Sequence, residues 1–186
     1  MARDTDVDAG AVTDFLARLA ARTPTPAGGS VAALCTAQAA ALVAMVARYV
    51  EEPGLVERAE RLVDRAHQLV VEDERAFSAV ARVWEVPRDR WAGPEERRAA
   101  IDEALLGASE PQAQVVETAL EVLVLIDQLR PRARPGLASD LVAAGEVARA
   151  GSSIARMNVE SNLRALPDSE GRSGLLRRMG VAKGRV

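Results

Sequence analysis

The chain has 186 residues, of which 48% are hydrophobic, 27% are charged and only 3% are aromatic, and its formal net charge is -3. This is the composition of one soluble globular domain with a core of Ala, Val and Leu, which favours closely packed helices over sheets. The charge gives no electrostatic reason to expect a nucleic-acid partner, the single cysteine excludes an intrachain disulfide, and the single histidine excludes the usual His/Cys zinc sites, so we expect no metal.

The chain is expected to begin with a flexible acidic leader over residues 1–12. A short helix follows, which starts at Thr13 and ends before Pro24. The leader is polar and no apolar run comes after it, so the sequence predicts no signal peptide. We therefore expect a cytoplasmic protein.

A stretch with two prolines and two glycines precedes the first long helix. Pro24 and Pro26 stiffen an extended approach, because each fixes its own φ and restricts the residue before it. Gly28 and Gly29 permit positive φ and a close approach to the main chain, and Ser30 can cap the helix that follows. The free N–H groups at such a helix start can hold a carboxylate, a phosphate or a carbonyl oxygen. The alternative is that the stretch only begins a helix.

The helix that begins at Ser30 is expected to run to about Val50. It carries no charge between Val31 and Ala47, which is close to the length of a membrane span. Most of these residues are alanine or other weakly apolar types, and alanine drives membrane insertion weakly. We therefore expect a buried helix in a soluble bundle or at a subunit interface, and no membrane partner.

The next helix is expected to run from Leu55 to about Trp84 and carries one apolar stripe. On a helical wheel the residues of this stripe lie within roughly 40° of Asp73, whereas Glu72 and Glu74 point to either side. Asp73 should therefore face inward, where a carboxylate without a partner is costly. Burial should also raise its pKa towards a range useful for acid–base chemistry.

Two more helical regions follow a loop. The first covers about residues 94–110, and Pro111 either starts a new helix or kinks the same one, which continues to about residue 129. The last long helix covers about residues 139–166. Its inner stripe consists mostly of small residues with a polar group at each end: Asp140, Ala144, Ala148, Gly151, Ala155, Asn158 and Asn162.

These patterns predict an all-α fold, a bundle of about five to six mostly long antiparallel helices in a single domain. The helical domain should cover residues 13–166. Beyond it, the segment 167–186 contains scattered glycines and basic residues, and we expect it to be largely disordered.

Four stretches resemble the cyclodeaminase/cyclohydrolase family in the same order along the chain. They are Pro24–Leu34, Asp73–Val80, Ala138–Asp140 and Gly151–Leu163, and the resemblance covers residues 13 to about 165. The family contains formiminotetrahydrofolate cyclodeaminases and methenyltetrahydrofolate cyclohydrolases. One departure is Ala27, which stands where the family usually has the first of three glycines.

The resemblance implies chemistry at the one-carbon bridge of a reduced folate, with a tetrahydrofolate derivative as substrate and no cofactor. A cationic reacting centre needs a nearby carboxylate, and an attacking water needs a general base. The candidate catalytic residues are Asp73 and Asp140. The alternatives are that Asp140 only caps its helix and that Asp73 pairs with a buried arginine.

The same resemblance implies a set of substrate-binding residues. Asn158 and Asn162 could read the polar edge of a pterin, and the glycine-containing loop could hold a carbonyl or carboxylate group. The alternative for the two asparagines is that they only bridge helices. The full set of candidate binding residues is Pro26, Gly28, Gly29, Ser30, Ser139, Asn158 and Asn162.

One spacing bears on the assembly. Asp140 and Asn158 share a helix face but are separated by about 27 Å along the helix, so they cannot both touch one pterin ring. Either they contact opposite ends of an elongated folate, or a second subunit brings them together, and we expect a homodimer packed across the small-residue face. Because no formiminotransferase domain accompanies this sequence, a cyclohydrolase is favoured over a cyclodeaminase. The competing hypothesis is a non-catalytic, dimerising helical bundle.

Overall fold

A computed structural model of the chain describes residues 9–179, and within this range it contains six α-helices and no strand. The helices are α1 (Ala9–Leu19), α2 (Gly28–Tyr49), α3 (Pro53–Glu85), α4 (Pro94–Leu129), α5 (Ala138–Leu163) and α6 (Glu170–Arg178). Short 3-10 turns at Arg88–Arg90 and Pro135–Leu137 precede α4 and α5. The predicted all-α, single-domain fold is confirmed.

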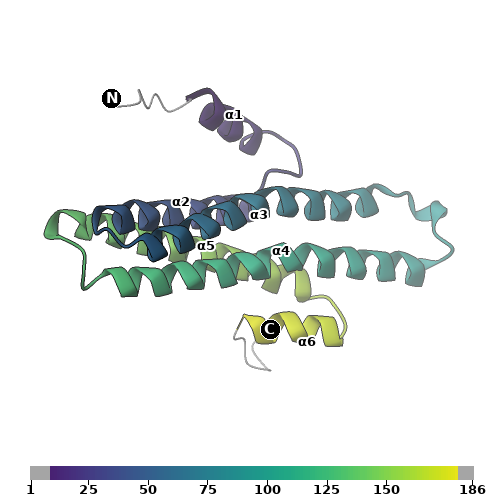
Figure 1. The fold of residues 1–186 in the computed structure, drawn as a ribbon. Coiled ribbons are helices and arrows are strands. Elements are labelled where there is room, and N and C mark those ends of the chain that lie inside the picture. The colour runs from purple at the N-terminus through teal and green to yellow at the C-terminus, as the bar shows by residue number, and fades with distance from the viewer. Residues whose placement is uncertain (1–8, 180–186) are drawn as a thin grey trace.

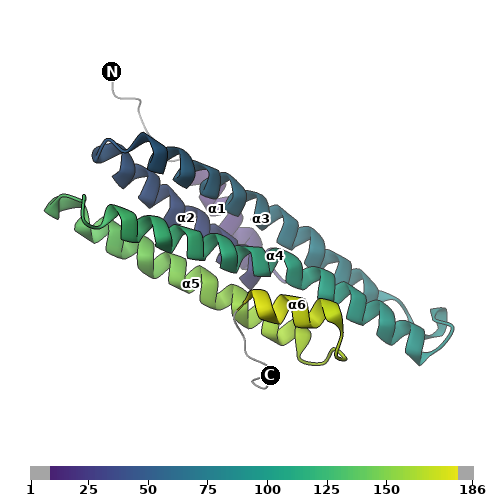
Figure 2. The same cartoon turned by 60° about the horizontal axis from the view of Figure 1, so that its bottom comes forward.

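Helices α2 to α5 lie side by side as an antiparallel bundle (Figures 1 and 2). Neighbours along the chain pack together, and α2 also packs against α5 and, across the bundle, against α4. The 33-residue α3 and the 36-residue α4 are longer than α2 and α5, so their joined end projects beyond the rest of the bundle (Figure 1). Helices α1 and α6 lie on opposite sides of this bundle.

Helix α2 is the central helix of the core. Its buried residues are mostly alanine and valine, and they pack against residues of α3, α4 and α5. Among the residues that the structure describes, α2 is the one helix long and apolar enough to cross a membrane, and 61% of its most apolar window is buried inside the protein. The expectation of a buried bundle helix is therefore confirmed, since these side chains already have protein partners.

Small residues let α2 and α5 pack at very close range. A Cβ atom on Gly151 would lie 2.7 Å from Oγ1 of Thr36 and 2.8 Å from the carbonyl oxygen of Ala32. Ala144, Ala148 and Ala155, on the same face of α5, are fully buried. The expectation that this face forms a dimer interface was wrong, because α2 of the same chain covers it.

Helix α4 passes through Pro111 without ending. The sequence left open whether this proline starts a new helix, and the structure places it inside one helix from Pro94 to Leu129. A proline removes the hydrogen bond to the carbonyl four residues earlier, here that of Gly107. Gly107 is exposed and has open space where a side chain would be, so water can reach this region of the helix.

The ends of the domain differ from the prediction. Helix α1 begins at Ala9 instead of Thr13, so residues 9–12 of the expected leader are helical, while residues 1–8 lie outside the described range. The expected disordered segment 167–186 contains α6, whose N-terminus is capped by the Ser169 hydroxyl. The composition of the segment, with its glycines and basic residues, suggested disorder. Its apolar residues, which include Leu175, nevertheless form one helix face that packs against α4 and α5. Residues 180–186 are not described.

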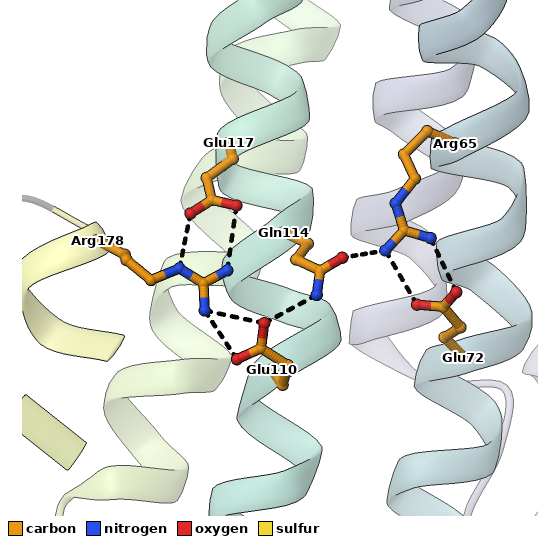
Figure 3. A network of polar contacts seen from close by, with 6 residues as sticks. All are labelled: Arg65, Glu72, Glu110, Gln114, Glu117 and Arg178. Carbon is orange, nitrogen blue, oxygen red and sulfur yellow. Dashed lines mark hydrogen bonds and ion pairs between the residues drawn. The ribbon is translucent and has the colours of Figure 1, made fainter. Parts of the chain in front are cut away.

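A polar network holds α6 against the bundle (Figure 3). Arg178 donates to both carboxylates of α4 that face it, at 2.7 Å to Glu117 and 2.8 Å to Glu110. Glu110 also accepts from Gln114 at 2.8 Å, and Gln114 in turn accepts from Arg65 of α3. The network therefore connects α6 through α4 to α3.

Candidate active site

A cavity of about 290 Å³ lies where the first turn of α2 meets α3, α4 and α5. Its walls combine small residues, two aromatic rings, three amides and one carboxyl group. The residues that line it are Ala27, Gly28, Gly29, Asp73, Phe77, Trp84, Ala108, Gln112, Asn158, Ser161 and Asn162. Asp73 is the one acid or base among them.

The Asp73 carboxyl group is held from two sides. The Ser30 hydroxyl donates to its Oδ2 at 3.0 Å, and Nε2 of Gln112 donates to its Oδ1 at 2.7 Å. The residue is only 7% exposed. Burial raises the pKa of Asp73 above its usual value, against the hydrogen bonds from Ser30 and Gln112, which lower it, and with a smaller rise from the charge of Glu74. The predicted inward position is confirmed, and its partners are neutral donors, not a buried arginine.

Gly29 gives this carboxyl group its space. A Cβ atom on residue 29 would lie 2.2 Å from Oδ1 of Asp73 and 2.5 Å from Nε2 of Gln112, which no side chain could tolerate without displacing them. Two properties were expected of Gly28 and Gly29, positive φ and a close approach to the main chain, and the structure shows only the second. Gly28 and Gly29 form the first turn of α2, with neither in the positive-φ region, and glycine is required at position 29 for close approach.

Ser30 and Ala27 also differ in role from the prediction. Ser30 does not cap α2, because the helix already starts at Gly28 and the Ser30 hydroxyl donates to Asp73 instead. Ala27 is the N-cap residue, with an extended backbone at φ -142° that any residue can adopt. The alanine at this place therefore costs no backbone strain, although the family usually has glycine there.

The two asparagines of α5 complete the opposite wall. Asn158 and Asn162 lie one turn apart and both line the cavity. Nδ2 of Asn158 donates to Oε1 of Gln112 in a long contact of 3.4 Å. A Cβ atom on Gly28 would lie 3.8 Å from the Asn158 amide, so this asparagine stands directly over the start of α2.

Six of the cavity residues were not predicted as site residues from the sequence, and Gln112, Phe77 and Trp84 are the large side chains among them. Gln112 is 1% exposed and lies three and four residues before the buried Val115 and Val116, so its place on an apolar helix face was a usable signal. Phe77 and Trp84 lie on the apolar stripe of α3 that also carries Asp73. Their rings meet edge to face at 6.0 Å and line the cavity, and Trp84 remains 48% exposed, as a residue at a cavity mouth would.

Other predicted site residues lie elsewhere. Pro26 is buried and does not line the cavity, whereas the next residue, Ala27, does. Ser139 and Asp140 lie in the first turn of α5, where Ser139 is exposed and Asp140 is partly buried. Along the helix axis Asp140 lies about 27 Å from Asn158, so within one chain it is not brought together with Asp73. The residues next to it line a separate cavity of about 440 Å³ between α4 and α5.

Comparison with known proteins assigns the chain to a family. Residues 11–180 match the family described as formiminotransferase-cyclodeaminase. A methenyltetrahydrofolate cyclohydrolase of Methylorubrum extorquens is 31% identical over 168 residues, which are 84% of this chain and 81% of that protein. The crystal structure of formiminotetrahydrofolate cyclodeaminase from Thermotoga maritima superposes with a TM-score of 0.80 over 91% of this chain and 86% of that one, and its 24% identity shows a shared fold. The chain therefore belongs to the formiminotransferase-cyclodeaminase family.

Proposed function

We propose that this protein is a methenyltetrahydrofolate cyclohydrolase, which adds water to 5,10-methenyltetrahydrofolate and produces 10-formyltetrahydrofolate. The sequence likeness to the cyclohydrolase of Methylorubrum extorquens supports this assignment. The observation that carries it is the buried carboxyl group of Asp73, the one ionisable group in a cavity otherwise lined by neutral side chains.

Asp73 suits both parts of this reaction. The methenyl carbon belongs to a cation delocalised over two nitrogens, and a carboxylate beside it stabilises that charge in surroundings of low polarity. The raised pKa of Asp73 makes its carboxylate a stronger base than an exposed aspartate. It can therefore take a proton from a water molecule as the water oxygen bonds to the methenyl carbon.

The second step returns the proton. The addition gives a neutral intermediate that carries a hydroxyl group on the former methenyl carbon, with Asp73 protonated. Asp73 then donates its proton to N5 as the bond between N5 and this carbon breaks, and the hydroxyl proton leaves as the carbonyl forms. The sum is one water consumed and one proton released, and Asp73 ends as a carboxylate.

The other cavity residues fit a flat, polar-edged substrate. The aromatic faces of Phe77 and Trp84 offer a stacking surface for a pterin ring. Asn158 and Asn162 supply amide groups for its polar edge. The first-turn amides of α2 add partial positive charge beside Gly28, which suits a carbonyl oxygen.

The proposed role of Asp140 and Ser139 depends on whether the protein is a dimer. Because they lie far from Asp73 within one chain, they act either on the distant end of the folate or at the cavity of a second subunit. We favour a cytoplasmic homodimer, formed through a surface other than the covered face of α5. A mass measurement by light scattering at working concentration checks this, and a monomer with full activity would exclude the second subunit from the site.

The decisive assay follows the absorbance of 5,10-methenyltetrahydrofolate when the protein is added. Loss of the methenyl chromophore well above the spontaneous rate is expected, and Asp73→Asn should reduce that rate by at least about 100-fold. Binding of the substrate without turnover would reject the hypothesis that the protein is an enzyme and would favour the non-catalytic helical bundle. The fold shared with the Thermotoga maritima cyclodeaminase makes formiminotetrahydrofolate the second substrate to test, with ammonia release as the readout.

A further inference from the structure

The side chain of Gln112 lies between two groups that face the cavity from different helices. It comes from α4, is 1% exposed, and contacts Asp73 of α3 on one side and Asn158 of α5 on the other. Because Asp73 also accepts from Ser30 of α2, a single amide joins the polar groups of all four bundle helices.

The direction of the Gln112 amide is fixed by its partners. An amide has one end that donates and one that accepts. Nε2 donates to Oδ1 of Asp73 at 2.7 Å, and Oε1 accepts from Nδ2 of Asn158. The reversed amide would place its oxygen against a carboxylate oxygen and its NH2 group against another NH2 group, which is unfavourable on both sides.

The fixed direction determines what Asn158 offers to a ligand. One N–H of its Nδ2 donates to Gln112, whereas its Oδ1 makes no hydrogen bond within residues 9–179. The cavity therefore presents two acceptors from different helices, the Asp73 carboxylate and the Asn158 carbonyl oxygen.

We propose that Gln112 is a positioning residue, which keeps Asp73 and Asn158 oriented so that both present acceptor oxygens to the cavity. A ligand bound here then meets Asn158 with a hydrogen-bond donor, such as a ring N–H or an amino group. Gln112 does not touch the reacting atoms and acts through its two neighbours. For its kinetic readout this inference rests on the proposed function.

The electrostatic surroundings of Asp73 make the role measurable. α2 contributes the Ser30 hydroxyl and main-chain N–H, α4 contributes the Gln112 amide, and the α5 residues that line the cavity are neutral. The charge that acts on the pKa of Asp73 is that of Glu74 on α3 itself, whose carboxylate is paired with Arg18 of α1 at 2.7 Å. A change at residue 112 should therefore alter the titration of Asp73 without competing effects from other charged neighbours.

Two substitutions separate positioning from simple packing. Gln112→Leu removes the donor to the carboxylate, so ionised Asp73 is less stabilised and the acid limb of the kcat/KM profile should move about one pH unit towards higher pH. Gln112→Glu has nearly the same shape but sets two carboxyl groups against each other, which should move the limb further. Gln114→Leu on the same helix is the matched control, and its limb should stay at the wild-type position.

Carbon-13 NMR of the Asp73 carboxyl group measures its titration directly and needs no catalytic activity. The pKa of Asp73 should rise from the wild type to Gln112→Leu and again to Gln112→Glu. In the wild-type chain, the side-chain NH2 resonances of Gln112 should also titrate with the midpoint of Asp73, which tests the contact even if the variants fold poorly. Wild-type protein without turnover but with these titrations would reject the proposed cyclohydrolase and retain the positioning role. Normal turnover with a Gln112 amide insensitive to Asp73, or an acid limb unmoved in both Gln112 variants, would overturn the positioning role.

Discussion

Gly29 and Asp73 lie so close together that a Cβ atom on residue 29 would stand 2.2 Å from the Asp73 Oδ1. The carboxyl group can occupy its place between Ser30 and Gln112 only because α2 carries no side chain at this point. One missing methyl group in the first turn of α2 thus sets the position of the candidate base on α3.

Gly29→Ala should therefore damage the site more than the fold. The new methyl group has to push the Asp73 carboxyl away from its donors, and we expect a destabilisation of about 1–3 kcal/mol together with loss of nearly all turnover. Urea unfolding and the absorbance assay measure the two effects. Gly107→Ala is the matched control, because Gly107 is exposed and an added Cβ atom would meet no neighbouring group within 4 Å. This substitution should raise stability by up to about 1 kcal/mol. A Gly29→Ala variant with wild-type kcat would refute the steric account.

Asp73→Asn should change how stability depends on pH. The pKa of Asp73 is raised in the folded chain, mainly by burial, so folding favours the protonated form. The stability that this preference provides is complete below the unfolded-state pKa and is lost as pH rises through the folded-state pKa. Asparagine cannot ionise, so the variant should gain stability relative to the wild type as pH rises from about 4 to 7.

Urea titrations of both proteins at several pH values in this range measure that difference. Asp127→Asn serves as the control for removing a carboxyl group from the surface, because the Asp127 side chain is 75% exposed. A difference between Asp73→Asn and the wild type that stays constant, or that shrinks with rising pH, would show that the buried carboxyl does not titrate as described.

The sequence was sufficient for features that follow from periodicity. The inward position of Asp73 and the burial of α2 came from spacing and composition, and both are present in the fold. The close approach at Gly29 depends on the distance between α2 and α3, which no local pattern contains. Gln112 could have been found, since a polar residue on an apolar face needs a buried partner, but its partners lie 39 and 46 residues away.

The small-residue stripe of α5 shows a second limit. Small side chains indicate close packing but do not specify the partner. Helix α2 of the same chain packs against this stripe, where a second subunit had been expected. The same holds for α6. A nine-residue helix with a short apolar face has little intrinsic stability, and its order depends on contacts with α4 and α5 that the local sequence does not reveal.

Gly151→Ala tests the packing of α2 against α5. The added methyl group would lie 2.7 Å from the Thr36 hydroxyl and 2.8 Å from a main-chain carbonyl of α2, so the two helices must move apart. We expect a loss of about 2 kcal/mol or more in the free energy of unfolding. Adding Thr36→Ala should restore only part of it, because the Ala32 carbonyl remains in the way. Full recovery in the double variant, measured by urea unfolding, would mean that the backbone contact is not limiting.

Arg178→Gln tests whether the ion pairs hold α6 on the bundle. Arg178 bridges Glu110 and Glu117, but its side chain is 35% exposed and those of the two acids are 45% and 41% exposed, so solvent screening reduces the expected loss to about 1 kcal/mol. Hydrogen–deuterium exchange should show faster exchange in α6 and little change in α2. In the wild type, added salt should have a similar but weaker effect.

Arg177→Gln on the same helix, a position without an ion pair among the described residues, should leave exchange unchanged. Exchange in Arg178→Gln that is no faster than in Arg177→Gln would indicate that the apolar contacts of Leu175 and Met179 alone hold α6.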